Sequence, residues 1–166
     1  MSKAVHSLVR DAGVIETISK LKRDVDLSSE PFVWANVALS TVAEQLPASI
    51  KSAWLFVLKK DTWSGAHMHP NSVQHMIVLE GRGQSKIDAQ TGDLFSASSE
   101  GPNANEWCVI PAATLHEFYP DGADMVVMSF HTCVADELIE VSAGGSVRHY
   151  EGTRTRARAS RRSAVE

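Results

Sequence analysis

The amino-acid sequence predicts a mostly β domain, a sandwich or barrel of short strands preceded by one α-helix. Three observations lead to this fold class. Segments rich in β-branched and aromatic residues follow one another from residue 32 to residue 134. Turn-forming runs such as "QTGD", "SSEGPNAN" and "PDGAD" separate many of them. Strands and helices do not alternate along the chain, so a parallel doubly wound sheet is not expected.

The helix is expected over residues 4–22. Apolar residues such as Val5, Leu8, Ile15 and Ile18 recur there mostly at steps of three and four, which places them on one helix face. Such a face is unstable in water, so we expect the helix to pack on the barrel or on a partner subunit. "DLSSEP" at 26–31 predicts a loop. Strands are expected at 32–42, 52–60, 75–83, 84–89, 93–98, 106–111 and 124–134.

Length and composition indicate a single soluble domain. The chain has 166 residues, a formal net charge of -4 and two cysteines, Cys108 and Cys133, which both lie in apolar runs and predict buried free thiols. No apolar run approaches the roughly 20 residues of a membrane span, and nothing resembles a signal peptide, so we expect a cytoplasmic protein. We divide the chain into a helix and linker (1–30), a β-barrel (31–147) and a flexible tail (148–166).

The tail holds six arginines against two glutamates and almost no apolar residue. A disordered, solvated segment is the simpler interpretation. The alternatives are a contact with nucleic acid or with the acidic body of a neighbouring subunit. The negative charge of the chain as a whole argues against nucleic acid as a partner of the rest of the protein.

The stretch "GAHMHPNSVQHMIVLEG" (65–81) holds three of the seven histidines. Residues two apart on a strand point to the same face, so His67 and His69 are expected to project together and could grip one divalent cation. On the strand that follows, Gln74 shares a face with Met76. If that face holds the metal, His75 points away from it, unless a bulge reverses the alternation. That strand is apolar on both faces, which is typical of a sheet covered on both sides.

Two spacings connect these residues with a distant histidine. In the first, His67-Met68-His69 is followed after four residues by Gln74 and after six more by Gly81. In the second, Asn105 is followed by five residues, Pro111-Ala112-Ala113, two residues and His116.

This pair of motifs resembles the two motifs of the cupin superfamily, over roughly residues 50–135. The resemblance implies a jelly-roll β-barrel, that is, a double-stranded β-helix, with one divalent metal bound inside it by His67, His69, Gln74 and His116. The chain departs from the motifs in having glutamine where glutamate is usual, at Gln74. It also has Asp61, Asn105 and Ala113 where glycines are usual, and Ala113 implies a slightly different turn before His116.

Three imidazoles and an amide form a neutral ligand set, which leaves the full charge of a divalent ion uncompensated. Such a site should hold metal less tightly than one with a carboxylate, and its metal should be a stronger Lewis acid. Imidazoles suit Fe, Mn, Ni, Zn or Cu. The resemblance implies an enzyme class that includes dioxygenases, isomerases, lyases and decarboxylases. Among these we favour an Fe-dependent dioxygenase or a related enzyme acting on a small oxygen-bearing molecule.

Candidates for acid–base groups are few. Glu117 and Tyr119 have the opposite strand parity to His116 and should point away from the metal. His131, in "MSFHTC", is a satisfied core residue or, as the best catalytic candidate, a group that lines the pocket.

Two other functions stay open. A single cupin barrel can bind or sense a small molecule without turning it over, and Gln74 would fit a site that has lost catalysis. A metal-free sugar epimerase would need a His–Asp or tyrosine pair in the pocket, for which the sequence offers no convincing spacing. By the resemblance we also expect a homodimer formed through sheet faces, which the two-sided apolar strand at 73–79 supports.

Overall fold

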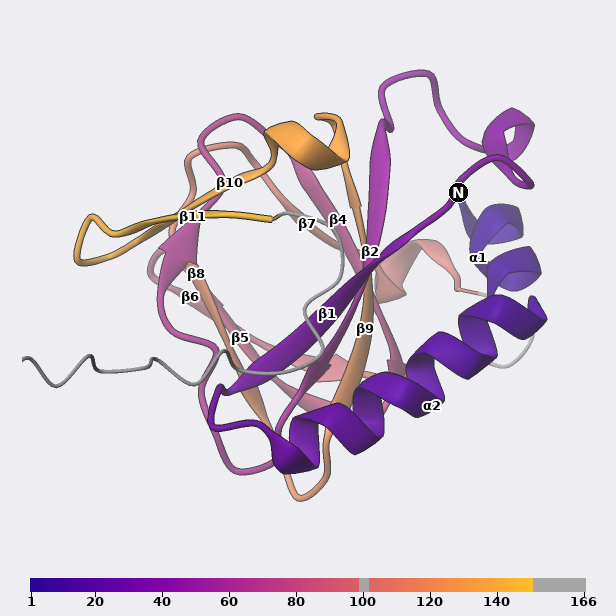
Figure 1. Cartoon of the computed structure of the whole chain (residues 1–166). Helices are drawn as coiled ribbons and strands as arrows, with labels where there is room; N and C mark the ends of the chain where they lie inside the picture. Colours follow the sequence, from indigo (N-terminus) through magenta and orange to yellow (C-terminus); the bar gives the residue numbers. More distant parts are fainter. Residues whose placement is uncertain (99–101, 151–166) are drawn as a thin grey trace, which may run out of the picture.

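A computed structural model describes residues 1–98 and 102–150 of the chain. Two antiparallel sheets face each other, and two helices lie on the outside of one of them (Figure 1). The predicted mostly β fold with an N-terminal helical segment is confirmed. None of the helices in the described part is long and apolar enough to cross a membrane.

The first sheet has five strands in the order β1-β2-β9-β4-β7. Their bounds are Phe32–Val37 (β1), Ser52–Leu58 (β2), Met125–His131 (β9), Gln74–Glu80 (β4) and Cys108–Ile110 (β7). The second has six strands in the order β11-β10-β3-β8-β5-β6. Their bounds are Val147–His149 (β11), Ile139–Ser142 (β10), His67–Met68 (β3), His116–Pro120 (β8), Arg82–Ile87 (β5) and Gln90–Phe95 (β6).

From β7 to β10 the chain alternates between the two sheets, as it also does from β2 through β3 to β4. Consecutive strands therefore lie opposite each other across the barrel, which is the jelly-roll arrangement. Because β3 and β8 are neighbours in one sheet while β4 lies in the other, the motif residues meet between the sheets.

The N-terminal segment forms two helices, α1 (Ser2–Leu8) and α2 (Ala12–Leu27), where the sequence predicts a single helix over 4–22. The break comes at Asp11, whose backbone is extended and whose carboxylate accepts hydrogen bonds from the N–H groups of Gly13 and Val14. Asp11 thus caps α2 at its N-terminus. The second helix also runs into the segment that predicts a loop at 26–31.

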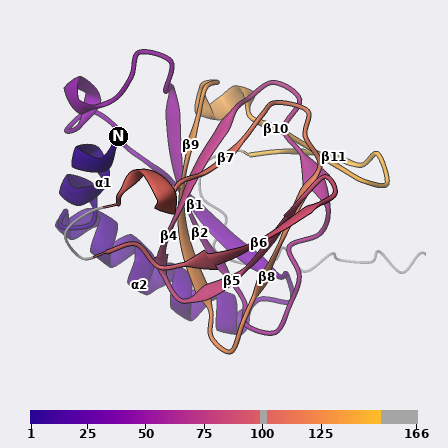
Figure 2. The ribbon, with the colours of Figure 1, turned by 180° about the vertical axis from the view of Figure 1, so that it is seen from behind.

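The core has two layers. One lies between the helices and the five-stranded sheet and includes Leu21, Leu55 and Ile77. The other lies between the two sheets and includes Trp54 and Met76. The views from the front and from behind place α2 along the outside of the sheet that holds β1, β2 and β9 (Figure 1, Figure 2).

The neighbours Met76 and Ile77 show why β4 is apolar on both faces: one faces the barrel interior and the other the layer beneath the helices. Packing within the chain therefore accounts for the feature that led us to expect a homodimer. The apolar strand therefore no longer supports a homodimer, which stays a prediction from the resemblance alone.

Two glycines shape the connection between β4 and β5. Gly81 has φ +81°, and a Cβ there would lie 2.5 Å from the carbonyl oxygen of Asp124. A Cβ on Gly83 would lie 2.4 Å from the carbonyl oxygen of Tyr119, because β5 pairs closely with β8. Gly81 thus forms the turn between β4 and β5, whereas Gly83 lies within β5, where the close approach of β8 leaves no room for a side chain.

The C-terminal end of the described chain belongs to the barrel. Arg148 and His149 lie in β11, and Tyr150 is fully buried against Trp34 and Trp54. The barrel thus extends past residue 147, where we expect the tail to begin. Residues 151–166, the rest of the expected tail, lie outside the described residues.

Candidate metal centre

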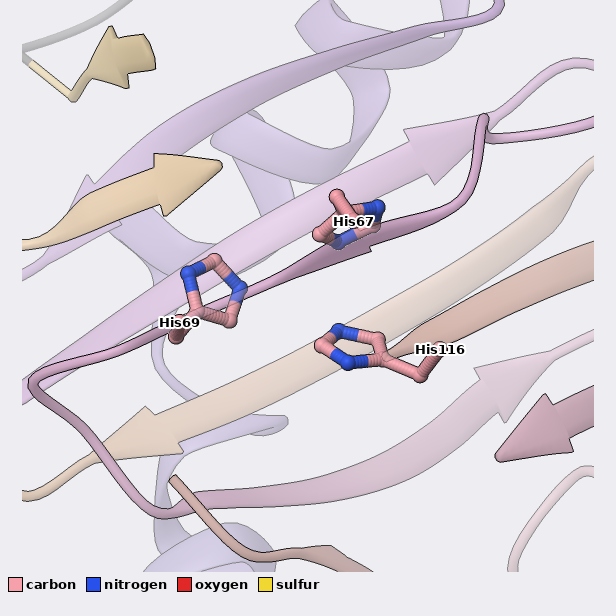
Figure 3. A group of neighbouring side chains, drawn as sticks. All are labelled: His67, His69 and His116. Atoms are coloured by element: carbon pink, nitrogen blue, oxygen red, sulfur yellow. The ribbon is translucent and has the colours of Figure 1, made fainter. Parts of the chain in front are cut away.

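Two neighbouring strands bring three histidines together. His67 lies in β3, His69 directly follows that strand, and His116 begins β8. In the sheet, His67 and His116 stand directly opposite each other. All three rings project to the same side, from two adjacent chain segments (Figure 3).

The ligand atoms of these histidines lie within 4.8 Å of one another. The ring centroids of His67 and His116 are 4.3 Å apart, and His69 is 5.4 Å from each of them. All three side chains are buried. A buried three-histidine cluster of this size could bind one metal ion.

Backbone carbonyls fix the tautomer of each ring. A carbonyl oxygen only accepts, so each Nδ1 carries the hydrogen and donates it, which leaves the lone pair on Nε2. The accepting carbonyls belong to Gly65 for His67 (2.7 Å), Ile139 for His69 (2.9 Å) and Thr114 for His116 (2.9 Å). Nε2 of His116 is buried and has no hydrogen-bond partner in the part of the chain that the structure describes. This is the orientation that metal-binding imidazoles need.

Two of the rings, those of His69 and His116, are held in their neutral form. Burial, and then the neighbouring His67, lower the pKa of His69 to about 4. Burial, His67 and His69 together lower the pKa of His116 to about 3. Neutral imidazole is the form that binds a cation, so at neutral pH both side chains are ready to bind without releasing a proton.

Gln74 enters the same cavity from the opposite sheet. It is the first residue of β4, its side chain is buried, and its Oε1 has no hydrogen-bond partner among residues 1–98 and 102–150. Gln74, His67 and His69 line one small cavity of about 30 Å³. An unpartnered buried amide oxygen is costly, and a cation is one partner that would satisfy it. Ligation by Gln74 stays a prediction.

His131, for which the sequence left a core role and a pocket role open, is not among the residues that line that cavity. It is completely buried, with Nδ1 3.2 Å from the hydroxyl of Ser72 and Nε2 3.0 Å from the hydroxyl of Ser129. Burial, followed by the charges of nearby histidines, lowers its pKa well below the usual range. Its ring is 5.1 Å from that of His69, so it packs against a candidate ligand as a satisfied core residue.

The turn before His116 keeps a glycine-like backbone despite its alanine. Ala113 has φ +59°, the left-handed region that glycine favours, and its N–H donates to the carbonyl of His69 (2.9 Å). Our expectation of a different turn at Ala113 finds no support in this backbone. The turn ties the loop of one candidate ligand to the backbone of another.

Sequence reasoning missed two residues of the site. Glu140 in β10 is buried, with Oε2 3.8 Å from Nε2 of His67. Tyr150 lines the cavity and donates its hydroxyl hydrogen to Glu140. The alternation in "IEVS" gave a weak signal for a strand, but the turn-rich segment around it and the arginines after it hid both residues.

No family model matches the chain, and no curated protein matches it at a significant level. Solved structures do match. Salicylate 1,2-dioxygenase from Pseudaminobacter salicylatoxidans superposes with a TM-score of 0.60 at 12% identity, over 80% of this chain and 38% of that chain. A variant of that enzyme in complex with gentisate gives 0.54 at 13%, over 71% of this chain and 32% of that chain.

The fold is that of a cupin. The resemblance read from the two motifs is therefore confirmed at the level of the fold. KdgF from Halomonas sp. is also similar, with a TM-score of 0.46 at 14% identity over 62% of this chain and 82% of that chain. The present chain spans less than half the length of the salicylate dioxygenase.

Proposed function

We propose that the protein is a metal-dependent oxidoreductase of the dioxygenase type, with His67, His69 and His116 as metal ligands. One observation carries the proposal: three buried imidazoles lie close enough together to share one ion, while a backbone carbonyl accepts from each Nδ1 and leaves each Nε2 available. Iron is the metal we favour, with Mn, Ni, Zn and Cu as alternatives. The similarity in fold to a salicylate dioxygenase supports the proposal of a dioxygenase.

The residues around the cluster would bind and orient a small oxygen-bearing substrate. Gln74 is the proposed fourth ligand, because its buried oxygen lacks a partner. Apolar side chains, among them Phe56 and Phe118, line the cavity and would exclude water. A divalent metal bound there would supply Lewis acidity toward an anionic or carbonyl oxygen of the substrate.

Oxygen consumption tests this proposal. Protein loaded with Fe²⁺ should consume dioxygen with at least one member of a set of catechols, gentisate, diketones and thiols, and His69→Ala should abolish the consumption. Turnover that His69→Ala leaves unchanged would contradict the assignment of the site. Binding of a small molecule with no turnover under any metal would favour the second function below.

The second candidate is a cupin that binds or senses a small molecule, and one observation favours it. His131, the best catalytic candidate in the sequence, does not line the cavity and has the hydroxyls of Ser72 and Ser129 as hydrogen-bond partners.

A further inference from the structure

A carboxylate is buried beside the histidine cluster. The side chain of Glu140 is only 8% exposed, and it lies in β10, next to the strand that carries His67. Burying a carboxylate costs several kcal/mol unless partners compensate it. Arg148 binds Oε1 at 3.1 Å, and the hydroxyl of Tyr150 donates to Oε2.

His67 and Glu140 lie at a distance that suits two ligands of one ion. Nδ1 of His67 donates to the carbonyl of Gly65, and its Nε2 lies 3.8 Å from Oε2 of Glu140. Two ligands at roughly 2.1 Å from one ion can lie up to about 4.2 Å apart, so a separation of 3.8 Å is compatible with a shared ion.

We propose that Glu140, in β10, supplies the carboxylate of this metal site. It would replace the glutamate that cupin motifs usually have at the position of Gln74 in β4. The inference rests on the proposed function in so far as that function includes the metal. The amide and the imidazoles offer no carboxylate, whereas Glu140 does: Arg148 binds its Oε1 and offsets part of its charge, while Oε2 lies toward His67. This charge lowers the free energy of a divalent ion at the cluster, by direct ligation or from the adjacent position.

Arg148 and Tyr150 act as positioning residues. Arg148 binds the oxygen farther from the contact with His67, and its guanidinium lies 5.2 Å from the ring centroid of Phe32 and 5.8 Å from that of Trp34. Tyr150 is fully buried among aromatic rings, so its hydroxyl reaches Glu140 from a fixed direction. Together they orient the carboxylate so that Oε2 faces the cluster.

Titration of the metal-free protein with Co²⁺ tests the role of Glu140. Glu140→Gln keeps the shape of the side chain and removes its charge, so Co²⁺ should bind about ten- to a hundredfold more weakly. Glu117→Gln is the matched control, because Glu117 is also buried but pairs with Lys86 and Trp63. Its affinity for Co²⁺ should equal that of the wild type.

A relocated charge makes the test sharper. The double variant Gln74→Glu, Glu140→Gln places the carboxylate on the other side of the cavity and should recover most of the lost affinity. The visible absorption of bound Co²⁺ should change in Glu140→Gln and stay unchanged in Glu117→Gln. If Glu140→Gln does not fold, Glu140→Asp replaces it; Asp keeps the charge, retracts the oxygens by one methylene and should also weaken binding.

The outcomes separate this inference from the proposed function. Equal affinity for Co²⁺ in the wild type and Glu140→Gln, together with a loss in His67→Ala, would overturn the role of Glu140 and leave the metal centre standing. Equal losses in Glu140→Gln and Glu117→Gln would also overturn it, because they would indicate general destabilisation. A wild type that binds no Co²⁺ would overturn both proposals.

Discussion

Acid should destabilise the metal-free protein well above the range in which carboxylates titrate. The pKa of His69 is lowered to about 4 and that of His116 to about 3, whereas both have an ordinary value of 6.5 in the unfolded chain. Below pH 6.5 the unfolded chain therefore binds protons that the folded protein excludes. Stability is at its full value above pH 6.5 and falls as the pH is lowered from there toward 4.

The size of the effect follows from the two shifts. Each histidine costs about 1.4 kcal/mol per pH unit inside that window, so the two together cost about 5 kcal/mol over two pH units. A domain of this size has a total stability of about 5–15 kcal/mol, so the loss approaches the whole. The lowered pKa of His131 acts in the same direction.

The titration of Glu117 does not change the stability of the protein in this pH range. Burial acts to raise its pKa, but hydrogen bonds from Lys86, Tyr119 and Trp63 hold the pKa below the ordinary 4.5. The stabilisation by Glu117 is therefore present above pH 4.5 and is lost only as the pH falls below it.

Urea denaturation of protein kept metal-free with a chelator measures the effect. The free energy of unfolding should fall steeply between about pH 6.5 and about pH 4.5, and His116→Gln, which cannot titrate, should show a shallower slope. A free energy that stays constant across this range in the wild type would refute the neutral, buried state of these rings.

Three substitutions test the scaffold of the site by thermal and urea unfolding. Ala113→Gly relieves the left-handed strain before His116 and should stabilise the protein by about 0.5–1 kcal/mol; a loss would mean that the residue is not left-handed. Gly83→Ala should destabilise it by more than about 2 kcal/mol, since the new Cβ meets the carbonyl of Tyr119, and a neutral effect would contradict the close pairing of β5 and β8. Tyr150→Ala should cost about 3–5 kcal/mol; a cost near zero would mean that this residue belongs to a solvated tail.

Local rules predicted the parts of the site that depend on strand geometry. Strand alternation predicted that His67 and His69 lie on one side. The spacing of the first motif, rather than alternation, pointed to Gln74, which lines the same cavity as these histidines. The link to His116 came from the spacing of the second motif, and the barrel places it opposite His67.

The features that the sequence did not reveal depend on contacts between distant segments or, in one case, on a side chain that caps a helix. The burial of Tyr150 depends on Trp34, Trp54 and Phe56, and no local pattern distinguishes it from the polar residues that follow. The break in the N-terminal helix depends on the Asp11 carboxylate, which accepts hydrogen bonds from the first N–H groups of α2. The apolar pattern continues across this break and therefore predicted a single helix. The hydroxyl contacts of His131 likewise come from packing rather than from its strand parity.

The metal content of protein purified without chelator and without added metal tests the central claim most directly. We predict close to one equivalent of a divalent transition metal per chain in the wild type, and its loss in His67→Ala and His116→Ala, which remove two of the converging imidazoles. Metal content that these substitutions leave unchanged, or a wild type that neither contains nor takes up a divalent metal, would contradict it.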